Sequence, residues 1–254
     1  MRDIILHHYD TSPYSEKVRL GFGLKGLAWA SVELPQIMPK PNLTALTGGY
    51  RKTPVLQIGA DIYCDSQLIM RELERRYPTM SFYPAGRGAA DALAWWAEKT
   101  MFLPAVSIVF AKRPEVLPEG FLEDRVKFSG RNIDPVVMMA AVPNHLDQLR
   151  AHFAWLDQTL ADGRPFLQGP AASLADFAAY HPAWYLQQNF GPAAPPFDGF
   201  PRLQTWAERI AAIGHGGRSQ MSAQQALDVA RDATSITTAT VDSQDPNGRK
   251  PGQT

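Results

Sequence analysis

The chain has 254 residues, and its 25 basic and 25 acidic side chains give a formal net charge of zero. Hydrophobic residues make up 45% and charged residues 20%, as in an ordinary soluble globular protein. The balanced charge argues against a partner such as nucleic acid or an anionic membrane. No apolar run approaches the ~20 residues of a membrane span, and the N-terminus does not resemble a signal peptide.

Cys64 is the single cysteine of the chain. It excludes an intramolecular disulfide and leaves no cysteine cluster for zinc. His7 and His8 have no metal-ligating partners at a usable spacing. We therefore expect no metal site, and a reducing cytoplasm is the location that fits best.

The first ~82 residues alternate between strand and helix patterns. The expected elements are a strand (3–9), a helix (13–27), a strand (30–34), a Pro-rich stretch with room for one short helix (35–52), a hairpin (53–66) and an amphipathic helix (66–77). This order is typical of a thioredoxin-like α/β domain with a mixed four-stranded sheet, which we assign to residues 1–82.

The character of the sequence changes after a Gly- and Ala-containing linker at residues 83–91. No convincing strand pattern occurs between residues 89 and 232, whereas helical periodicity recurs there. Residues 92–232 are therefore predicted to form an all-helical bundle domain. Residues 233–254 are polar and rich in turn formers, which predicts a C-terminal tail.

Ser12 stands between the first expected strand and the helix that Pro13 begins. Its hydroxyl can cap the helix, and proline suits the first helical position because that position needs no N–H. The free amides of the first turn also attract an anion, and they would favour a thiolate placed beside them. The motif alone leaves open a plain cap, contributing about 1 kcal/mol, or a catalytic position.

Two later motifs have the same ambiguity. Thr53-Pro54 precedes a strand, so the proline either opens an edge strand or forms a cis bond that turns backbone groups toward a ligand. Asp65-Ser66 begins the next helix, as another cap or as an anion-binding terminus with a carboxylate beside it. A site that offers partners to both a carboxylate and an ammonium group suits the end of a peptide.

The order and spacing of these motifs resemble the glutathione S-transferase family over roughly residues 3–215. The residues that carry the resemblance are Ser12-Pro13-Tyr14-Ser15, Thr53-Pro54-Val55-Leu56, Asp65-Ser66, and the capping-box pair Ser173 and Asp176 in the helical half. The resemblance implies glutathione as co-substrate, an apolar electrophile and a homodimer.

The resemblance also implies residue roles. Ser12 falls where serine- and cysteine-type members keep the catalytic residue, and it would help to ionise the glutathione sulfur. Pro54 would be the cis proline, Val55 or Thr53 would bond the cysteinyl part, and Asp65 with Ser66 would hold the γ-glutamyl end. Lys40 either resembles a lysine at the glycyl end or is a solvated loop charge. The implied glutathione-binding residues are Tyr14, Lys40, Thr53, Pro54, Val55, Asp65 and Ser66.

The chain departs from other members at the end of the first strand. A serine at position 12 cannot form the mixed disulfide of cysteine-type members, so thiol-reductase activity is not expected. The tyrosine of tyrosine-type members aligns with His8. Tyr9, one residue later, should point to the opposite face of the strand, into the core or an interface.

Residues 21–26, GFGLKG, match the dinucleotide pattern G-x-G-x-x-G. A nucleotide site requires these glycines between a strand and the start of a helix, whereas here they lie inside and at the end of one, with Gly26 as a C-terminal cap. The favoured function is a serine-type transferase that attacks an electrophile by conjugation, dehalogenation or ether cleavage. The alternative is a non-catalytic glutathione-binding or scaffold protein.

Overall fold

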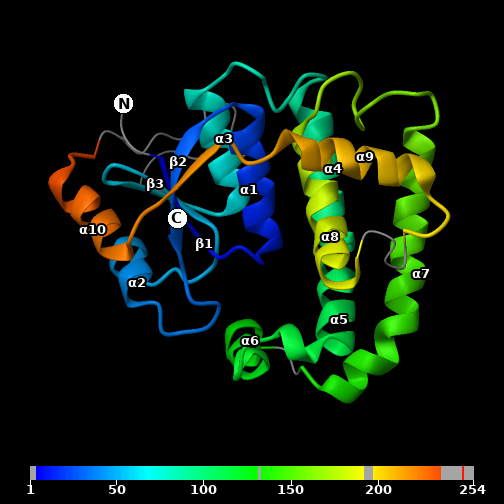
Figure 1. Cartoon of the computed structure of the whole chain (residues 1–254), viewed down its shortest axis with the longest axis horizontal. Coiled ribbons are helices and arrows are strands. Elements are labelled where there is room, and N and C mark those ends of the chain that lie inside the picture. Colours follow the sequence, from blue (N-terminus) through cyan, green and yellow to red (C-terminus); the bar gives the residue numbers. More distant parts are fainter. Residues whose placement is uncertain (1–3, 131–132, 192–196, 236–247, 249–254) are drawn as a thin grey trace.

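The computed structural model describes residues 4–130, 133–191, 197–235 and 248. An α/β domain and a helical domain lie side by side, and helix α1 of the first contacts helix α8 of the second (Figure 1). The predicted tail, 233–254, lies outside the described residues except for 233–235 and 248. No helix within the described ranges is long and apolar enough to cross a membrane.

The α/β domain contains a mixed sheet with the strand order β4-β3-β1-β2-β5. β1 pairs in parallel with β2 and antiparallel with β3, and β3 pairs antiparallel with β4. This is the predicted thioredoxin-like arrangement, but the sheet has five strands and not four. The strands are β1 (Ile4–His8), β2 (Ala28–Glu33), β3 (Val55–Ile58), β4 (Asp61–Cys64) and β5 (Gly217–Gln220).

The fifth strand corrects the prediction that residues 89–232 contain no strand. β5 pairs in parallel with β2 at the edge of the sheet. The helix that follows, α10 (Ala223–Asp232), packs next to α2, and its Ala226 is fully buried against Ile5 and Val32 of the sheet. The last part of the predicted helical domain therefore covers the α/β domain.

Three helices complete the α/β domain: α1 (Pro13–Leu24), α2 (Pro41–Thr47) and α3 (Ser66–Arg76). α2 is the short helix for which the Pro-rich stretch left room. The glycines of GFGLKG lie within and just after α1, as predicted, and Gly26 has a positive φ of 61°. A Cβ atom at Gly23 would overlap the carbonyl oxygen of Gly214, so this glycine permits close contact between the domains.

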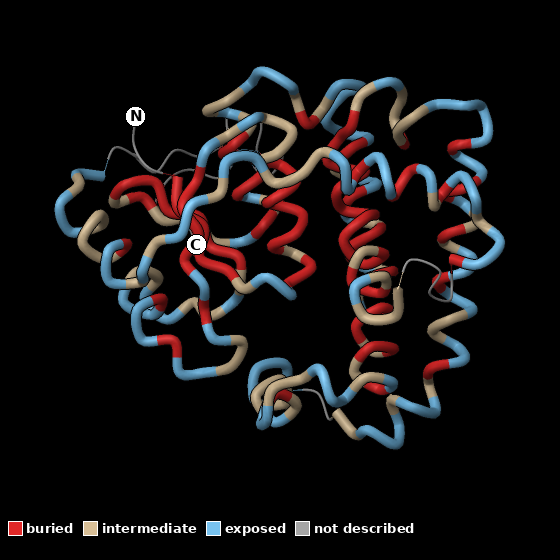
Figure 2. Tube along the Cα trace, viewed as in Figure 1, coloured by how far each residue is buried: buried red, intermediate tan, exposed pale blue. Residues whose placement is uncertain are grey.

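The helical domain forms the larger part of the apolar core. Figure 2 shows buried residues concentrated in the sheet, in α1 and in the helices at the centre of the molecule. α4 begins inside the predicted linker, Met101 separates α4 from α5, and α6 was not predicted. The helices are α4 (Arg87–Thr100), α5 (Phe102–Lys112), α6 (Phe121–Ser129), α7 (Pro135–Thr159), α8 (Leu174–Phe190) and α9 (Pro201–Ile213), with a short 3-10 turn at Pro114–Val116.

The capping box predicted at the start of α8 is present. Ser173 is the N-cap, and the Asp176 carboxylate accepts from the Ser173 backbone N–H at 2.9 Å. Asp176 is fully buried and also accepts from the Trp206 indole of α9 at 2.9 Å. The capping box therefore links α8 to α9 in addition to capping the N-terminus of α8.

Candidate active site

Ser12 occupies the turn between β1 and α1. Its backbone is extended, with φ −78° and ψ 119°, and its Oγ accepts a hydrogen bond from the Ser15 backbone N–H at 3.3 Å. Pro13 takes the first helical position, where its missing N–H has no intrahelical role. The structure thus confirms that Ser12 caps the helix. The Ser15 hydroxyl is buried without a hydrogen-bond partner.

The other two motifs are close to the predicted geometry. The Thr53–Pro54 peptide bond is cis, as the second interpretation of that motif requires. Asp65 is the N-cap of α3 and accepts from the Gln67 backbone N–H at 2.8 Å. Its φ of 79° is unusual for a residue with a side chain, and such strained positions concentrate at ligand sites.

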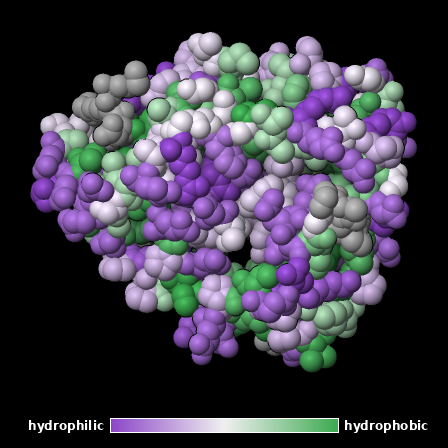
Figure 3. Space-filling view, viewed as in Figure 1, coloured by the Kyte–Doolittle hydropathy of each residue, from purple (hydrophilic) through white to green (hydrophobic). Residues whose placement is uncertain are grey.

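A cavity of about 710 Å³ lies between the two domains. Figure 3 shows the surface hollowed at this boundary. Six of the predicted site residues line the cavity: Tyr14, Lys40, Thr53, Pro54, Asp65 and Ser66. Ser12 and Val55 do not line it, although Thr11 and Pro13, on either side of Ser12, do.

The helical domain supplies an apolar wall to the same cavity. Aromatic and aliphatic side chains from α5, α6 and α8 face it, and nothing in their periodicity distinguishes them from core residues. The wall includes Phe102, Val106, Phe110, Phe121 and Tyr185. One cavity therefore combines polar groups suited to a peptide with a surface suited to an aromatic or aliphatic compound.

Lys40 is a buried cation at the entrance to α2. It is 4% exposed, its Nζ lies 3.4 Å from the Thr53 hydroxyl, and no carboxylate among the described residues forms an ion pair with it. Burial lowers the pKa of Lys40 to about 8, and the nearby charges of Arg125 and Arg51 act in the same direction. A buried, unpaired ammonium group facing a cavity favours an anionic ligand group.

Glu98 also lines the cavity and joins the helical domain to the α/β domain. Its carboxylate forms an ion pair with Lys17 of α1 and accepts from the Gln67 side chain at 3.2 Å. Burial alone would raise the pKa of Glu98, but Lys17 and His181 outweigh it and hold the pKa well below its usual range. Glu98 is therefore a fixed negative charge near the start of α3.

Helix α6 closes another side of the cavity. Asp124 accepts from the Arg51 guanidinium at 2.7 Å and from the Met38 backbone N–H at 3.2 Å. Arg125 donates to the Gln36 carbonyl at 3.0 Å. These bonds attach the helical domain to the loops on both sides of α2, and Figure 1 shows α6 at the bottom of the view, between the two domains.

Tyr9 lines the cavity, contrary to the expectation that it points away from the site. β1 ends at His8, so the alternation of a strand does not extend to Tyr9. Burial raises the pKa of the Tyr9 hydroxyl, although the nearby Arg125, which lines the same cavity, acts in the opposite direction. Sequence reasoning also missed Thr11 and Arg125, for which no local pattern gave a signal.

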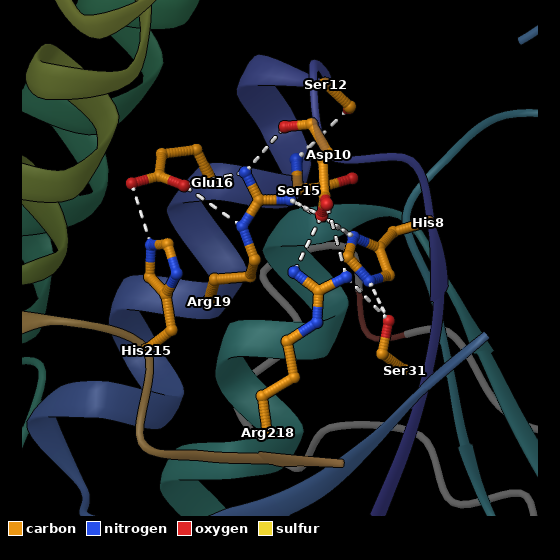
Figure 4. Close-up of polar contacts among 9 residues, drawn as sticks. All are labelled: His8, Asp10, Ser12, Ser15, Glu16, Arg19, Ser31, His215 and Arg218. Atoms are coloured by element: carbon orange, nitrogen blue, oxygen red, sulfur yellow. Dashed lines mark hydrogen bonds and ion pairs between the residues drawn. The ribbon is translucent and has the colours of Figure 1, made fainter. Parts of the chain in front are cut away.

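A polar network supports the turn that carries Ser12 (Figure 4). Arg19 donates to Glu16 at 2.7 Å, and Glu16 is also 3.0 Å from the His215 ring nitrogen. Arg218 of β5 donates to Asp10 at 2.8 Å. These contacts attach the segment after α9 to both ends of the turn between β1 and α1. They restrict the movement of the turn.

Comparison with known proteins agrees with this architecture. Residues 6–81 match the family model "Glutathione S-transferase, N-terminal domain", and residues 139–209 match "Glutathione S-transferase, C-terminal domain". A solved GST-like protein from Pseudomonas syringae is 42% identical, with a TM-score of 0.78 over 98% of this chain and 82% of that one.

Two curated relatives are more distant. Glutathione S-transferase theta-1 of Rattus norvegicus is 28% identical over 65% of this chain, and the match spans 63% of the relative's length. FtsZ-localized protein A of Caulobacter vibrioides is 24% identical over 81% of this chain and 85% of its own. The N-terminal and C-terminal family models match this chain in that order, and the solved relative has the fold described above. The chain therefore belongs to the glutathione S-transferase family.

Proposed function

We propose that this protein is a glutathione transferase that ionises the thiol of glutathione for attack on an apolar electrophile. The observation that carries the proposal is the cavity between the two domains. Polar groups suited to binding a peptide line one part of it, and aromatic and aliphatic side chains line another. The reaction is a nucleophilic substitution or addition at the electrophile, with the sulfur forming the new bond. Conjugation, dehalogenation and ether cleavage all have this form.

Ser12 is the proposed catalytic residue. A free thiol has a pKa of about 8.5, and lowering it by ~2 units requires ~2.7 kcal/mol of preferential stabilisation of the thiolate. The amides at the start of α1 and the Ser12 hydroxyl are groups of the type that provide this. Cations that line the cavity, among them Lys40, Arg51 and Lys52, add a favourable potential for the anion.

The remaining proposed contacts follow the chemistry of the tripeptide. Asp65 and Ser66, at the start of α3, would hold the ammonium and carboxylate of the γ-glutamyl end. The backbone beside the cis Pro54, at Thr53 or Val55, would bond the cysteinyl part. Lys40 would bind the glycyl carboxylate. Tyr14, which lines the cavity next to Pro13, completes the proposed set.

The test has two parts, binding and turnover. Calorimetric titration with S-methylglutathione reports on the peptide pocket, and a panel of chlorinated aromatics, alkyl halides, epoxides and aryl ethers reports on chemistry. We expect micromolar to millimolar binding and turnover of at least one class. Absence of binding would remove glutathione from the proposal altogether.

A second candidate is a glutathione-binding protein without transferase activity. It is favoured by the likeness to FtsZ-localized protein A, whose name describes a localisation and not a transferase. Binding of S-methylglutathione with no turnover across the panel would support this candidate. The homodimer expected of the family stays a prediction, which analytical ultracentrifugation checks. The cytoplasmic location also stays a prediction.

The position of Lys40 predicts a pH-dependent affinity. With a pKa near 8 in the free protein, Lys40 is charged below about pH 7 and neutral above about pH 9. A bound carboxylate stabilises the charged form, so affinity for the carboxylate falls as pH rises through this window. We expect the Kd of S-methylglutathione to rise about 3- to 10-fold more between pH 7 and 9 in the wild type than in Lys40→Arg.

The Lys40→Arg variant is the control because arginine stays charged throughout this range. S-methylglutathione has no ionisable thiol, and loss of its own ammonium affects both proteins equally. Identical pH profiles for wild type and variant would exclude Lys40 as the carboxylate partner.

A further inference from the structure

Three cationic side chains gather where α6 meets the loop that follows α2. Arg125 of α6 and Arg51 and Lys52 of the loop line the cavity. The guanidinium carbon of Arg125 lies 4.2 Å from the centre of the Phe121 ring. The guanidinium carbon of Arg51 and the ammonium of Lys52 lie 5.0 and 5.7 Å from the centre of the Phe128 ring. We call Arg51, Lys52 and Arg125 the α6 cation cluster.

The α6 cation cluster has more positive charge than its protein partners neutralise. Asp124 pairs with both arginines, accepting from Arg51 at 2.7 Å and from Arg125 at 2.5 Å. Lys52 forms no ion pair with any residue that the structure describes. Asp124 does not line the cavity, whereas all three cations do. A net positive charge therefore remains on the side of the cluster that faces the cavity.

The effect of the α6 cation cluster on Lys40 supports this charge balance. Burial is the largest cause of the lowered pKa of Lys40, and repulsion by Arg125 and then by Arg51 comes next. The attraction of Asp124 opposes them and is the smallest of these effects. This part of the cavity is therefore positive with Asp124 in place.

The proposed glutathione contacts do not use this charge fully. The glycyl carboxylate is assigned to Lys40, and one carboxylate cannot also neutralise a cluster of further cations. Arg125 belongs to the helical domain and lies over Phe121, a residue of the apolar wall assigned to the electrophile. A cation in such a partly apolar setting is stabilised by an anion bound to it.

We propose that the electrophile is an acid, an apolar compound with a carboxylate that Arg125 and Arg51 bind while its apolar part lies against the aromatic wall. The inference rests on the proposed function, because it names the class of second substrate for that same cavity.

The chemistry of the two arginines suits this ligand. A guanidinium offers a planar fork of N–H donors that matches a carboxylate. Arg51 donates to Asp124 through Nη2, and its Nη1 and Nε have no acceptor among the described residues. Beside them, the Phe110 and Phe121 rings meet edge to face, with centres 5.2 Å apart, and both line the cavity. Apolar surface and cations thus adjoin one another, as an acid with an aromatic or aliphatic body requires.

The test compares two glutathione conjugates of the same size by calorimetric titration at pH 7. S-(4-carboxybenzyl)glutathione carries the proposed carboxylate, and S-(4-carbamoylbenzyl)glutathione carries a neutral amide in its place. We expect the wild type to bind the carboxylate about tenfold more tightly, equivalent to ~1.4 kcal/mol. In Arg125→Met this ratio should fall to within about twofold. Because both ligands are measured on the same protein, a general loss of packing cancels from the ratio.

Three further variants separate the proposed contact from other effects. Arg51→Met should also lower the ratio, and it keeps Arg125 and its bond to the Gln36 carbonyl. Arg125→Lys retains the charge without the planar fork, so its ratio should lie between those of the wild type and Arg125→Met. Lys127→Met is the control, because it removes a charge from an exposed position of α6 that does not line the cavity. Its ratio should equal that of the wild type.

Turnover supplies a second measurement, with 4-(chloromethyl)benzoate and 4-(chloromethyl)benzamide as the matched electrophiles. The glutathione sulfur forms a bond to the methylene carbon, the carbon–chlorine bond breaks, chloride leaves with the bonding electrons, and the thiol proton passes to solvent. Each kcat/KM is divided by the rate constant of the uncatalysed reaction. The result should favour the benzoate about tenfold in the wild type and should lose this preference in Arg125→Met.

The outcomes distinguish this inference from the function on which it rests. Equal Kd values of the two conjugates in the wild type would overturn the inference and leave the glutathione pocket in place. Equal losses for both conjugates in Arg125→Met would assign Arg125 to the glycyl carboxylate or to packing, which also overturns it. A ratio lowered as much by Lys127→Met would replace the site by a general charge effect. If neither conjugate nor S-methylglutathione binds, the proposed function fails as well.

Discussion

Replacement of Ser12 by alanine should lower turnover about 10- to 100-fold, equivalent to ~1.4 to 2.7 kcal/mol of transition-state stabilisation. The reason is that the Ser12 hydroxyl, at the start of α1, is the proposed donor to the sulfur, and alanine has no hydroxyl to replace it. Binding of S-methylglutathione should be largely retained, because the proposed contacts to both ends of the tripeptide remain. Steady-state kinetics and calorimetry on the same preparations measure the two effects separately.

Ser15→Ala is the matched control for this change. Ser15 lies in the same first turn of α1, is equally buried, and its hydroxyl has no hydrogen-bond partner. Its removal should leave turnover within about twofold of the wild type. Ser12→Ala also removes a helix cap, which costs about 1 kcal/mol of stability, so thermal unfolding must show that the variant is folded at the assay temperature. Unchanged turnover in Ser12→Ala would exclude Ser12 from the mechanism.

The elements of the fold that were predicted correctly are those whose formation depends on the local sequence pattern. The hairpin at residues 53–66 and the helix that follows were predictable because each contains its own periodicity and turn residues. The cap positions Ser12 and Asp65 were also predictable, since a cap requires only a polar side chain and its own next turn.

β5 was not predictable, and the reason is physical. Its sequence, Gly-Arg-Ser-Gln, has no apolar residue and is mostly exposed. The strand forms because the edge of β2 offers unpaired backbone groups and because Arg218 reaches Asp10 and Ser31. Both causes lie far away in the sequence, where a local pattern cannot register them.

The candidate site shows the same division. The motifs at Thr53-Pro54 and Asp65-Ser66 were found because they are short and contiguous. That Tyr9 and Arg125 line the same cavity depends on how α6 lies against the α/β domain, and α6 itself was missed. Its docking depends on the Asp124–Arg51 pair, which no sequence periodicity connects. For a site formed between two domains, sequence reasoning therefore finds the residues that belong to local motifs and misses those that domain packing brings together.

Replacement of Asp176 by alanine should cause the largest loss of stability among these variants, on the order of 4 kcal/mol. The fully buried carboxylate accepts four hydrogen bonds: from the backbone N–H of Leu167 at 2.8 Å, from the N–H and hydroxyl of Ser173 at 2.9 and 2.6 Å, and from the Trp206 indole at 2.9 Å. Alanine leaves all these donors without a partner, and each buried donor left unpaired costs about 1–3 kcal/mol. Chemical denaturation measures the loss.

The chain contains its own control for Asp176, because α10 begins with a second capping box. There Ser222 is the N-cap and Gln225 takes the place of Asp176, but both residues are exposed. Gln225→Ala should cost less than about 1 kcal/mol, since water replaces the lost bond. Asp176→Asn should remain strongly destabilising, because its amide N–H₂ would face donors. Equal losses at Asp176 and Gln225 would show that burial of the carboxylate contributes nothing beyond the cap, and that the link from α8 to α9 through Trp206 does not stabilise the helical domain.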